Sequence, residues 1–348
     1  MWVTSSFATV LTPTAVALGN FDGVHRGHSQ VIKPILQQPG AAQSIAMTPP
    51  FPEGQGGIEG LRLPNSKENL ERPIRLGKGH TYSTVATFNP HPREFFSGQS
   101  WNLLTTRSEK VQQLSLLGVE QLVLLPFDRE LASLSPQEFV EKILMQQLQA
   151  THVSVGEDFH FGHRRAGTAD ELKAIASSYG VEVSIVSLQM CQGERISSSS
   201  IRQSLLEGDI SKANLRLGRP YTLTGVVVKG QQLGRKLGFP TANLQLPPEK
   251  FLPKHGVYGV RVHHPTLSSL ASSPCAVMNI GHRPTVSGIG VTVEVHLLDW
   301  SGDLYGQTLT VSLEQFLRPE QKFASLEDLK RQIQVDCEAA RAVLGCRD

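Results

Sequence analysis

The stretch 14–30, Thr-Ala-Val-Ala-Leu-Gly-Asn-Phe-Asp-Gly-Val-His-Arg-Gly-His-Ser-Gln, constrains the fold more than any other part of the chain. Ala15–Leu18 is a short apolar run typical of a buried strand, and Gly19 and Gly23 then permit tight turns. The run Gly27–Leu36 repeats apolar residues at helical spacing. A strand, a tight loop and a helix start predict a junction of a parallel α/β sheet, where N–H groups and the helix dipole can bind phosphate.

Two histidines stand in this junction. His25 and His28 are three residues apart, so at a helix start they share a face. Two imidazoles there can donate hydrogen bonds to a phosphate whose negative charge grows during transfer. The ordinary alternative is a loop with two surface histidines. A zinc site would need further ligands, and no cysteine or carboxylate is suitably placed beside the pair.

Strands and helices alternate through the rest of the first half. We expect strands at 82–88, 121–125, 152–155 and 181–188, with helices opened by the capping residues Thr106, Ser135 and Thr168. This order predicts a parallel sheet covered by helices on both faces. Ligands of such sheets bind at the carboxyl ends of strands. The loops that follow Leu18, Phe88 and Val155 leave such ends, so we expect the site there.

Residues 38–79 interrupt the pattern. They are rich in proline and glycine and show no sustained period, which is typical of a disordered linker. We therefore expect a disordered surface insertion. A segment that docks a partner or covers a site is the alternative.

The second half has a different pattern. Short alternating runs separated by Gly and Pro turns begin near Thr222 and continue to Leu313, which predicts an antiparallel β domain, a small barrel. Ser325 then opens an amphipathic helix that ends near Leu344. Its apolar face is expected to hold Leu326, Leu329, Ile333, Cys337, Ala340 and Leu344. The sequence predicts two domains, residues 1–218 and 219–348.

Two segments of the second half carry candidate chemistry. In the glycine-rich turn that starts at Gly230, Arg235 and Lys236 could cradle phosphates, although such turns are common in β proteins. Thr241 and Asn243 are two apart in an extended run, so both side chains point the same way, and their oxygens suit Mg²⁺. Glu294 lies on the polar face of the run 291–298, where a plain surface strand would also explain it.

Composition narrows the function classes. A net charge of +2 and a pI near 8.3 are too weakly basic to indicate nucleic-acid binding. No run reaches the roughly 18 apolar residues that span a bilayer. The four cysteines include no CxxC pair, and the N-terminus lacks a signal-peptide pattern. We expect reduced thiols, a cytoplasmic protein with small-molecule substrates, no nucleic-acid or membrane partner, and a monomer or weak homo-oligomer.

The string Gly-Asn-Phe-Asp-Gly-Val-His-Arg-Gly-His resembles the HxGH signature of the nucleotidylyltransferase superfamily. In its extended form it is similar to the adenylyltransferase module of bifunctional riboflavin kinase/FAD synthetases. Three later segments resemble further motifs of that module: Thr-Phe-Asn-Pro-His-Pro ending at 92, Gly156–Gly167 and Ile196–Arg202. Two residues depart from these motifs. Asp158 stands where the family frequently has Asn, and Ser199 replaces a Thr.

For the first half, this resemblance implies a Rossmann-like nucleotidylyltransferase domain. It implies that His25, His28 and Arg202 stabilise the pyrophosphate leaving group and that Asp158, Phe159 and Phe161 bind flavin. It implies a nucleotide site formed by Gly19, Asn20, Phe21, Asp22, Gly27, Asn89, His91, Ser197, Ser198 and Ser199.

The second half resembles the riboflavin kinase module. The run ending Pro240-Thr-Ala-Asn243 is similar to the GRxLGFPTAN signature, and 292–299 is similar to the TVEVHLLD strand. The resemblance implies that Glu294 is the general base. It also implies Mg²⁺ on Thr241 and Asn243, flavin on Tyr258 and Arg318, and nucleotide on Gly230, Arg235, Lys236 and Gly238.

Together the two resemblances imply two ATP-dependent steps: phosphorylation of riboflavin to FMN, then adenylylation of FMN to FAD with release of pyrophosphate. Three alternatives remain at this point. One activity alone could be retained, another HxGH transferase could use a different phosphate acceptor, or the protein could be a non-catalytic flavin-binding regulator.

Overall fold

The computed structural model describes residues 1–38, 79–230, 232–264, 273–285 and 288–346. They divide into two compact units, which we call the α/β unit, up to Ser198, and the barrel unit, from Ser199 onward. Apart from its two end residues, the predicted insertion 38–79 lies outside the described residues. The domain boundary after residue 218 stays a prediction.

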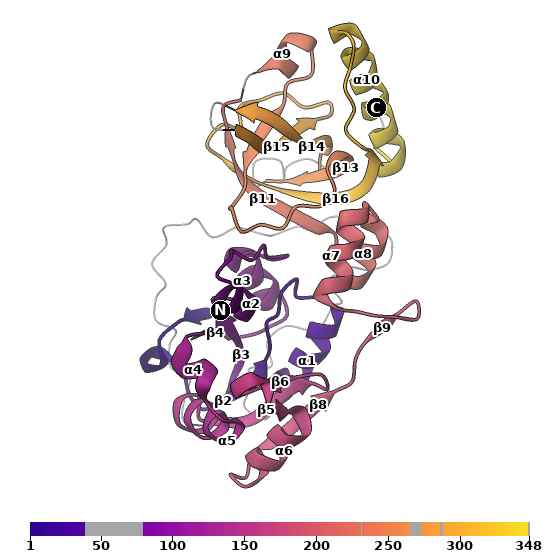
Figure 1. The fold of residues 1–348 in the computed structure, drawn as a ribbon. Helices are drawn as coiled ribbons and strands as arrows, with labels where there is room; N and C mark the ends of the chain where they lie inside the picture. The colour runs from indigo at the N-terminus through magenta and orange to yellow at the C-terminus, as the bar shows by residue number, and fades with distance from the viewer. Residues whose placement is uncertain (39–78, 231, 265–272, 286–287, 347–348) are drawn as a thin grey trace. The chain divides into compact units, whose positions relative to one another are not determined.

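The α/β unit is built on a six-stranded sheet in which every neighbouring pair is parallel (Figure 1). All five residues of the central strand β2 are buried, as its apolar run predicts. The order is β1-β4-β3-β2-β5-β8, with β1 at Trp2–Thr4, β2 at Thr14–Leu18, β3 at Tyr82–Asn89, β4 at Gln121–Pro126, β5 at Ala150–Gly156 and β8 at Glu182–Val186. The predicted parallel sheet is confirmed; the short edge strand β1 was not predicted.

The helices begin at the predicted capping residues. Thr106, Ser135 and Thr168 each accept a hydrogen bond from the backbone N–H three residues on, which satisfies a donor that the first turn leaves unpaired. After α5 the helix continues as a π-helix. The helical segments are α1 Arg26–Leu36, α2 Pro92–Ser97, α3 Arg107–Leu116, α4 Arg129–Ser133, α5 Pro136–Glu138, the π-helix Phe139–Gln147 and α6 Ala169–Ser177.

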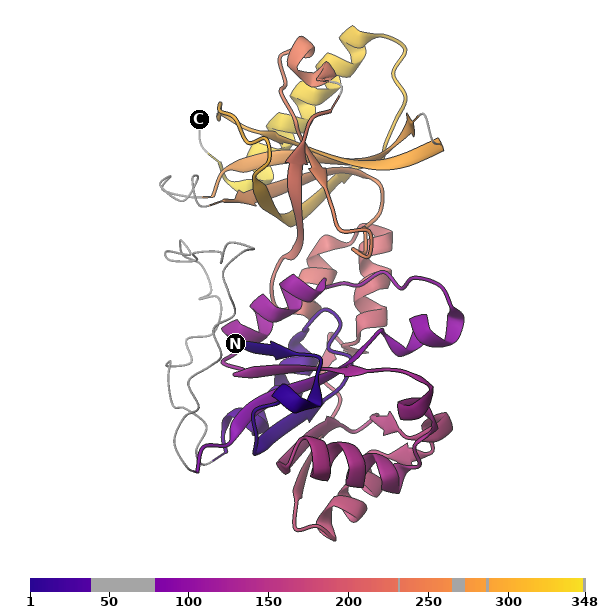
Figure 2. The same ribbon diagram turned by 90° about the vertical axis from the view of Figure 1, so that its left-hand side faces the viewer.

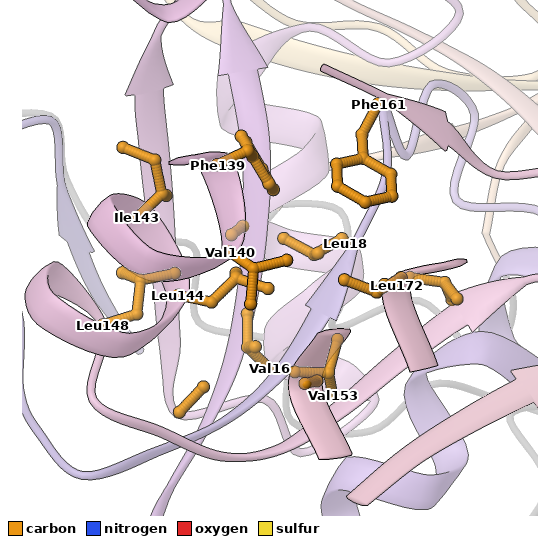
Figure 3. Packing of buried hydrophobic residues seen from close by; sticks show 14 of the residues in the cluster. Val16, Leu18, Phe139, Val140, Ile143, Leu144, Leu148, Val153, Phe161 and Leu172 are labelled. Atoms are coloured by element: carbon orange, nitrogen blue, oxygen red, sulfur yellow. The ribbon is translucent and has the colours of Figure 1, made fainter. Parts of the chain in front are cut away.

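Successive side chains of β2 enter two different cores, because strand side chains alternate between faces. Val16 and Leu18 pack with the π-helix and α6 on one face, and Figure 3 shows Phe139 and Leu172 around them. Ala15 and Ala17 belong to the core that α1 and α3 cover on the other face. The predicted coverage of both faces is confirmed.

The barrel unit contains a closed antiparallel barrel of six strands, as the alternating pattern predicts (Figure 2). Its order is β11-β12-β15-β14-β13-β16, with β11 at Tyr221–Val228, β12 at Ala242–Gln245, β13 at Gly256–His263, β14 at Cys275–Thr285, β15 at Gly288–Leu297 and β16 at Thr308–Arg318. Three short helices complete it: α7 Ser198–Glu207, which begins at the last residue of the α/β unit, α8 Ile210–Leu217 and α9 Leu233–Leu237.

The last helix, α10 at Leu326–Leu344, packs on β13, β14 and β16. Ser325 caps it, and Cys337, Ala340 and Leu344 form its buried stripe, as predicted. Leu326, which the helical period placed on that stripe, is 53% exposed. Among the described residues, no helix has the length and apolar character needed to cross a membrane.

The expectation that all four cysteines are free thiols is wrong for two of them. Cys275, at the start of β14, is disulfide-bonded to Cys346, just after α10. The two cysteines are 71 positions apart in the sequence, and their bond joins the end of the helix to the barrel. Cys191 and Cys337 are free. Sequence spacing alone gives no sign of a pair so far apart.

Candidate functional sites

The first site lies where β2 ends and α1 begins. The strand β2 pairs with β3 on one side and β5 on the other, all in parallel. The three loops predicted to form a site therefore leave the same edge of the sheet from adjacent strands. The chain order reverses at β2, and such switch points are where α/β sheets bind ligands.

His25 and His28 cap the helix reciprocally. The backbone N–H of His28 donates to Nδ1 of His25 at 3.3 Å, and the N–H of His25 donates to Nδ1 of His28 at 3.4 Å. The two rings stack with centroids 3.6 Å apart. An imidazole whose Nδ1 accepts a hydrogen bond carries its proton on Nε2 when neutral, so each ring offers an Nε2–H donor. The predicted shared face is confirmed.

The loop between β2 and the histidines is fixed by contacts from other strands and loops. The carbonyl of Asn20 accepts from the Thr87 hydroxyl at 3.0 Å and from the Lys110 ammonium at 2.8 Å. The Asp22 carboxylate is buried and accepts from the backbone N–H groups of Leu104 and Thr105. Asp22 therefore holds the loop in place, whereas its predicted contact with nucleotide stays a prediction.

This loop contains two strained positions. Phe21 and Val24 have φ values of 46° and 41°, in the left-handed region that costs non-glycine residues about 1 kcal/mol or more. Both side chains are almost fully buried, which offsets that cost. At Gly27 a Cβ would lie 3.2 Å from the His25 ring, so glycine there lets the ring pack against the helix start.

Lys110 is an ionisable group that the sequence analysis did not identify. Burial lowers the pKa of its ammonium to about 8, and the neighbouring Asp22 carboxylate opposes part of that shift. The lysine comes from α3, far along the chain from the loop that it contacts. Its position in the sequence of α3 gives no sign that it is buried, so it could not be told from a surface lysine.

The loop after β3 supplies the second part of the site. His91 caps α2 by accepting from the Arg93 N–H at 3.2 Å. Its ring stacks on Trp101 with centroids 5.6 Å apart, and the Arg93 guanidinium lies 4.9 Å from the same indole. Asn89 ends β3. The nucleotide contacts expected of Asn89 and His91 stay predictions, and Trp101 is an aromatic neighbour that the sequence analysis missed.

Asp158, in the loop after β5, stands where the family frequently has Asn, and its charge is paired within this chain. Its carboxylate accepts a charge-assisted hydrogen bond from Arg195, which comes from the hairpin of β9 (Met190–Cys191) and β10 (Glu194–Arg195). Phe161 is 4% exposed and packs against Phe139 in the core (Figure 3), whereas Phe159 is partly exposed. Phe161 therefore supports the loop. Flavin binding by these residues stays a prediction.

The serine cluster divides between the two units. Ser198 is the last residue of the α/β unit, and its hydroxyl donates to the Asp22 carbonyl at 2.8 Å. Ser197 lies directly before it and is half-buried. Ser199 and Arg202 belong to the barrel unit, where the Arg202 guanidinium lies 4.7 Å from the Phe251 ring centroid. Their phosphate contacts stay predictions.

The second site lies on the barrel. Asn243 of β12 is directly opposite Glu294 of β15, and Glu294 is also opposite Asn279 of β14. Opposite residues of antiparallel strands project from the same face, so a carboxylate is flanked by two amides. Thr241 immediately precedes β12. The structure thus brings the predicted base beside one of the predicted magnesium ligands.

The glycine-rich turn packs closely on these ligands. A Cβ at Gly230 would lie 2.5 Å from Nδ2 of Asn243, and one at Gly234 would lie 3.4 Å from the Thr241 methyl. The turn contains the short helix α9, which ends at Gly238 with a φ of 91°. Arg235 is exposed. The side chain of Lys236 lies outside the described part of the chain.

Tyr258 and Arg318, the two residues of the barrel predicted to bind flavin, both contact other residues of the barrel unit. Tyr258 is fully buried, donates to the Lys254 carbonyl and packs edge-on against Phe316. Arg318 makes a two-pronged ion pair with Asp336 of α10 at 2.7 and 2.8 Å. Their flavin contacts stay predictions.

Comparison with known proteins identifies both halves. Residues 8–53 and 75–200 match the FAD synthetase family, and residues 217–344 match the riboflavin kinase family. The two matches cover most of the chain. The parallel sheet, apart from its edge strand β1, lies within the first match, and the barrel lies within the second.

The chain is similar to curated proteins over nearly its whole length. It is 39% identical to the bifunctional riboflavin kinase/FMN adenylyltransferase of Pseudomonas fluorescens, covering 94% of this chain and 91% of the relative. It is 36% identical to that of Escherichia coli K12, covering 95% and 92%. A crystal structure described as a macrolide-efflux protein from Streptococcus pneumoniae has a TM-score of 0.76 and 28% identity over 97% of this chain and 98% of that one. The chain belongs to the family of bifunctional riboflavin kinases/FMN adenylyltransferases.

Proposed function

We propose that the two units divide the two reactions of this bifunctional enzyme between them. The α/β unit transfers AMP from ATP to FMN, and the barrel phosphorylates riboflavin with ATP. The observation that carries this division is chemical. Imidazole and backbone N–H donors gather at the end of β2, whereas a carboxylate with hydroxyl and amide oxygens gathers on the barrel.

In the α/β unit, the FMN phosphate attacks the α-phosphorus of ATP and pyrophosphate leaves. A phosphate is already ionised at neutral pH, so no protein base is required. Positioning and charge stabilisation therefore supply the catalysis. The Nε2–H groups of His25 and His28 donate to the phosphoryl oxygens, and Ser197 and Ser198 bind the triphosphate. As the family resemblance implies, Ser199 and Arg202 are expected to contact phosphate as well.

In the barrel, Glu294 accepts the proton of the ribityl 5′-hydroxyl as its oxygen attacks the γ-phosphorus of ATP and ADP leaves. Riboflavin presents an alcohol that is not ionised at neutral pH, so this step needs a base. Asn243 and Asn279 lie opposite Glu294 on the two neighbouring strands, so their side chains flank the carboxylate on the same face of the sheet.

Two residues of the barrel fit a magnesium ion. Thr241 and Asn243 supply hydroxyl and amide oxygens, and Mg²⁺ prefers hard oxygen ligands. The close packing of Gly230 on Asn243 holds that amide in place. When bound on Thr241 and Asn243, Mg²⁺ would neutralise phosphate charge.

Further proposals concern the whole protein. The domain boundary falls after residue 218, at the end of α8, and riboflavin, FMN and ATP are the small-molecule ligands. We place the protein in the cytoplasm as a monomer or weak homo-oligomer without a nucleic-acid partner. Gel filtration with light scattering tests the oligomeric state.

A time course tests the two activities. The purified full-length chain is incubated with riboflavin, ATP and Mg²⁺, and the flavins are separated by chromatography. We expect FMN to appear first and then to convert to FAD. FMN that accumulates without FAD would mean that only the barrel is active, whereas FAD formed only from supplied FMN would mean that only the α/β unit is active. If neither flavin changes, the enzyme assignment fails and a flavin-binding regulator becomes the next hypothesis.

A further inference from the structure

Three consecutive strands of the barrel bring two histidines and a glutamate together at one end. His255 directly precedes β13, whose first residue, Gly256, pairs with Ile280 of β14. His282 lies two residues further along β14. Glu320 follows β16 by two residues, and the end of β16 pairs with the start of β13. The cluster therefore follows from the strand order β14-β13-β16, which Figure 1 shows side by side.

The ligand atoms of this cluster converge. The Nδ1 atoms of His255 and His282 are 3.0 Å apart, and Nδ1 of His282 is 3.9 Å from Oε2 of Glu320. One ligand atom from each residue lies within 4.8 Å of the other two. Ligands of a tetrahedral zinc ion are about 3.4 Å apart, because metal–ligand bonds are about 2.1 Å long. These separations bracket that value.

Gly281 makes room for the carboxylate. A Cβ at this position would collide with Oε1 of Glu320 and would lie 3.1 Å from Nδ2 of Asn279. Its φ is not in the left-handed region, so the backbone does not itself require glycine. The missing side chain instead lets Glu320 lie over β14 beside the two imidazoles.

We propose that His255, His282 and Glu320 form a binding site for a divalent transition-metal ion of the zinc class. Two imidazoles and one carboxylate are the ligand set of open zinc sites, in which a fourth position holds water or another ligand. Imidazole nitrogen disfavours Mg²⁺, so this site is distinct in chemistry from the oxygen set around Asn243.

The two sets of residues are neighbours on the barrel. A Cβ at Gly281 would lie against both the Glu320 carboxylate and the Asn279 amide, and Asn279 is opposite Glu294. The simplest competing explanation is a hydrogen bond between the two imidazoles, in which one Nδ1 keeps its proton. Metal binding requires that neither Nδ1 carries a proton, so the two explanations give different results in a metal titration.

The experiment is a metal titration of the full-length protein. The protein is stripped with a chelator, and Zn²⁺ is titrated in competition with a chromophoric chelator. Co²⁺ is then used as a spectroscopic probe. We expect one Zn²⁺ equivalent that binds more tightly than any other. The Co²⁺ complex should show the visible bands of a four- or five-coordinate ion without thiolate charge transfer, because the ligands are nitrogen and oxygen.

Matched variants locate the tight site. His282→Ala should lose the tight equivalent, and Glu320→Gln should weaken it while keeping the side-chain shape. His264→Gln, a histidine just after β13 and outside the cluster, should retain it. Circular dichroism melting without metal checks that each variant is folded. Equal zinc binding by wild type and both cluster variants, or no tight equivalent in wild type, would overturn the proposal. So would thiolate charge transfer.

Discussion

In the proposed division of labour, the two units would bind the phosphates of ATP with opposite chemistry. In the α/β unit, the groups at the end of β2 are donors: two imidazoles that cap α1 and the N–H groups at the start of that helix. On the barrel, the groups around Glu294 are mostly acceptors: carboxylate, amide and hydroxyl oxygens. The first set suits negative charge directly, whereas the second suits a proton or a cation.

The difference follows from the nucleophile of each reaction. A phosphate nucleophile arrives ionised, so its site has to stabilise charge and hold reactants in line. An alcohol arrives neutral, so its site has to remove a proton as well. The way in which the groups are positioned also differs. The loop between β2 and His25 is held by residues distant in sequence, whereas Asn243 and Glu294 lie opposite each other on neighbouring strands. Substitutions should therefore separate the two activities cleanly.

Among substitutions that keep the shape of the side chain, the largest expected effect is on the barrel. Glu294→Gln keeps the shape of the side chain but cannot accept a proton, so FMN formation should fall by about 10²- to 10⁴-fold. FAD formation from supplied FMN should stay at the wild-type rate, which serves as the internal control. Both rates are measured by flavin chromatography. Undiminished kinase activity would remove Glu294 as the base.

The complementary change is at His28. His28→Ala should abolish FAD formation and leave FMN formation intact. His28→Asn is sharper, because its amide oxygen can still accept from the His25 N–H while the outer donor is lost. We expect this variant to melt near the wild-type temperature but to make FAD about 10²- to 10³-fold more slowly. FAD synthesis at the wild-type rate in either variant would show that His28 has no catalytic part.

A smaller effect is expected at Gly230. In Gly230→Ala the new methyl group would lie 2.5 Å from the Asn243 amide, so that side chain has to move. We expect the KM for Mg-ATP in FMN formation to rise about 10- to 100-fold, as for other changes that displace a metal ligand. Gly259→Ala, whose nearest neighbour would be at 3.8 Å, is the matched control. An unchanged KM in both variants would argue against Asn243 as a metal ligand.

Local patterns predicted most of the fold. The buried strands are apolar runs, and the helices open at side chains whose capping role depends on residues three positions away. The edge strand β1 was missed because three residues are too few to show a period. The reciprocal histidine cap was missed because histidine is not among the residues that favour helix starts. What the sequence predicted of the fold was therefore what short stretches determine by themselves.

The missing parts of the sites depend on contacts distant in sequence. Lys110 reaches a carbonyl 90 residues earlier, and Arg195 reaches Asp158 across 37 residues. The imidazole pair of the proposed zinc cluster spans 27 residues. None of these contacts has a periodic or spacing signal, because tertiary structure alone brings the partners together. A candidate loop could be found from sequence, but the groups that fix it could not.

The last prediction concerns Lys110. It distinguishes the two units by the pH dependence of their stability and not by a reaction rate. Its pKa is about 8 in the folded protein and 10.5 when exposed, so between these pH values the unfolded chain binds more protons. The free energy of unfolding of the α/β unit should therefore rise with pH in this window, by about 3 kcal/mol from this group. Lys110→Met should lack that rise.

The measurement is urea unfolding read by pulse proteolysis at several pH values, since proteolytic fragments report each unit separately. Other groups titrate in the same window, so the quantity of interest is wild type minus variant. Lys173→Met, an exposed lysine of α6, is the control and should follow wild type. Parallel profiles for wild type and Lys110→Met would mean that the ammonium is not held at a lowered pKa.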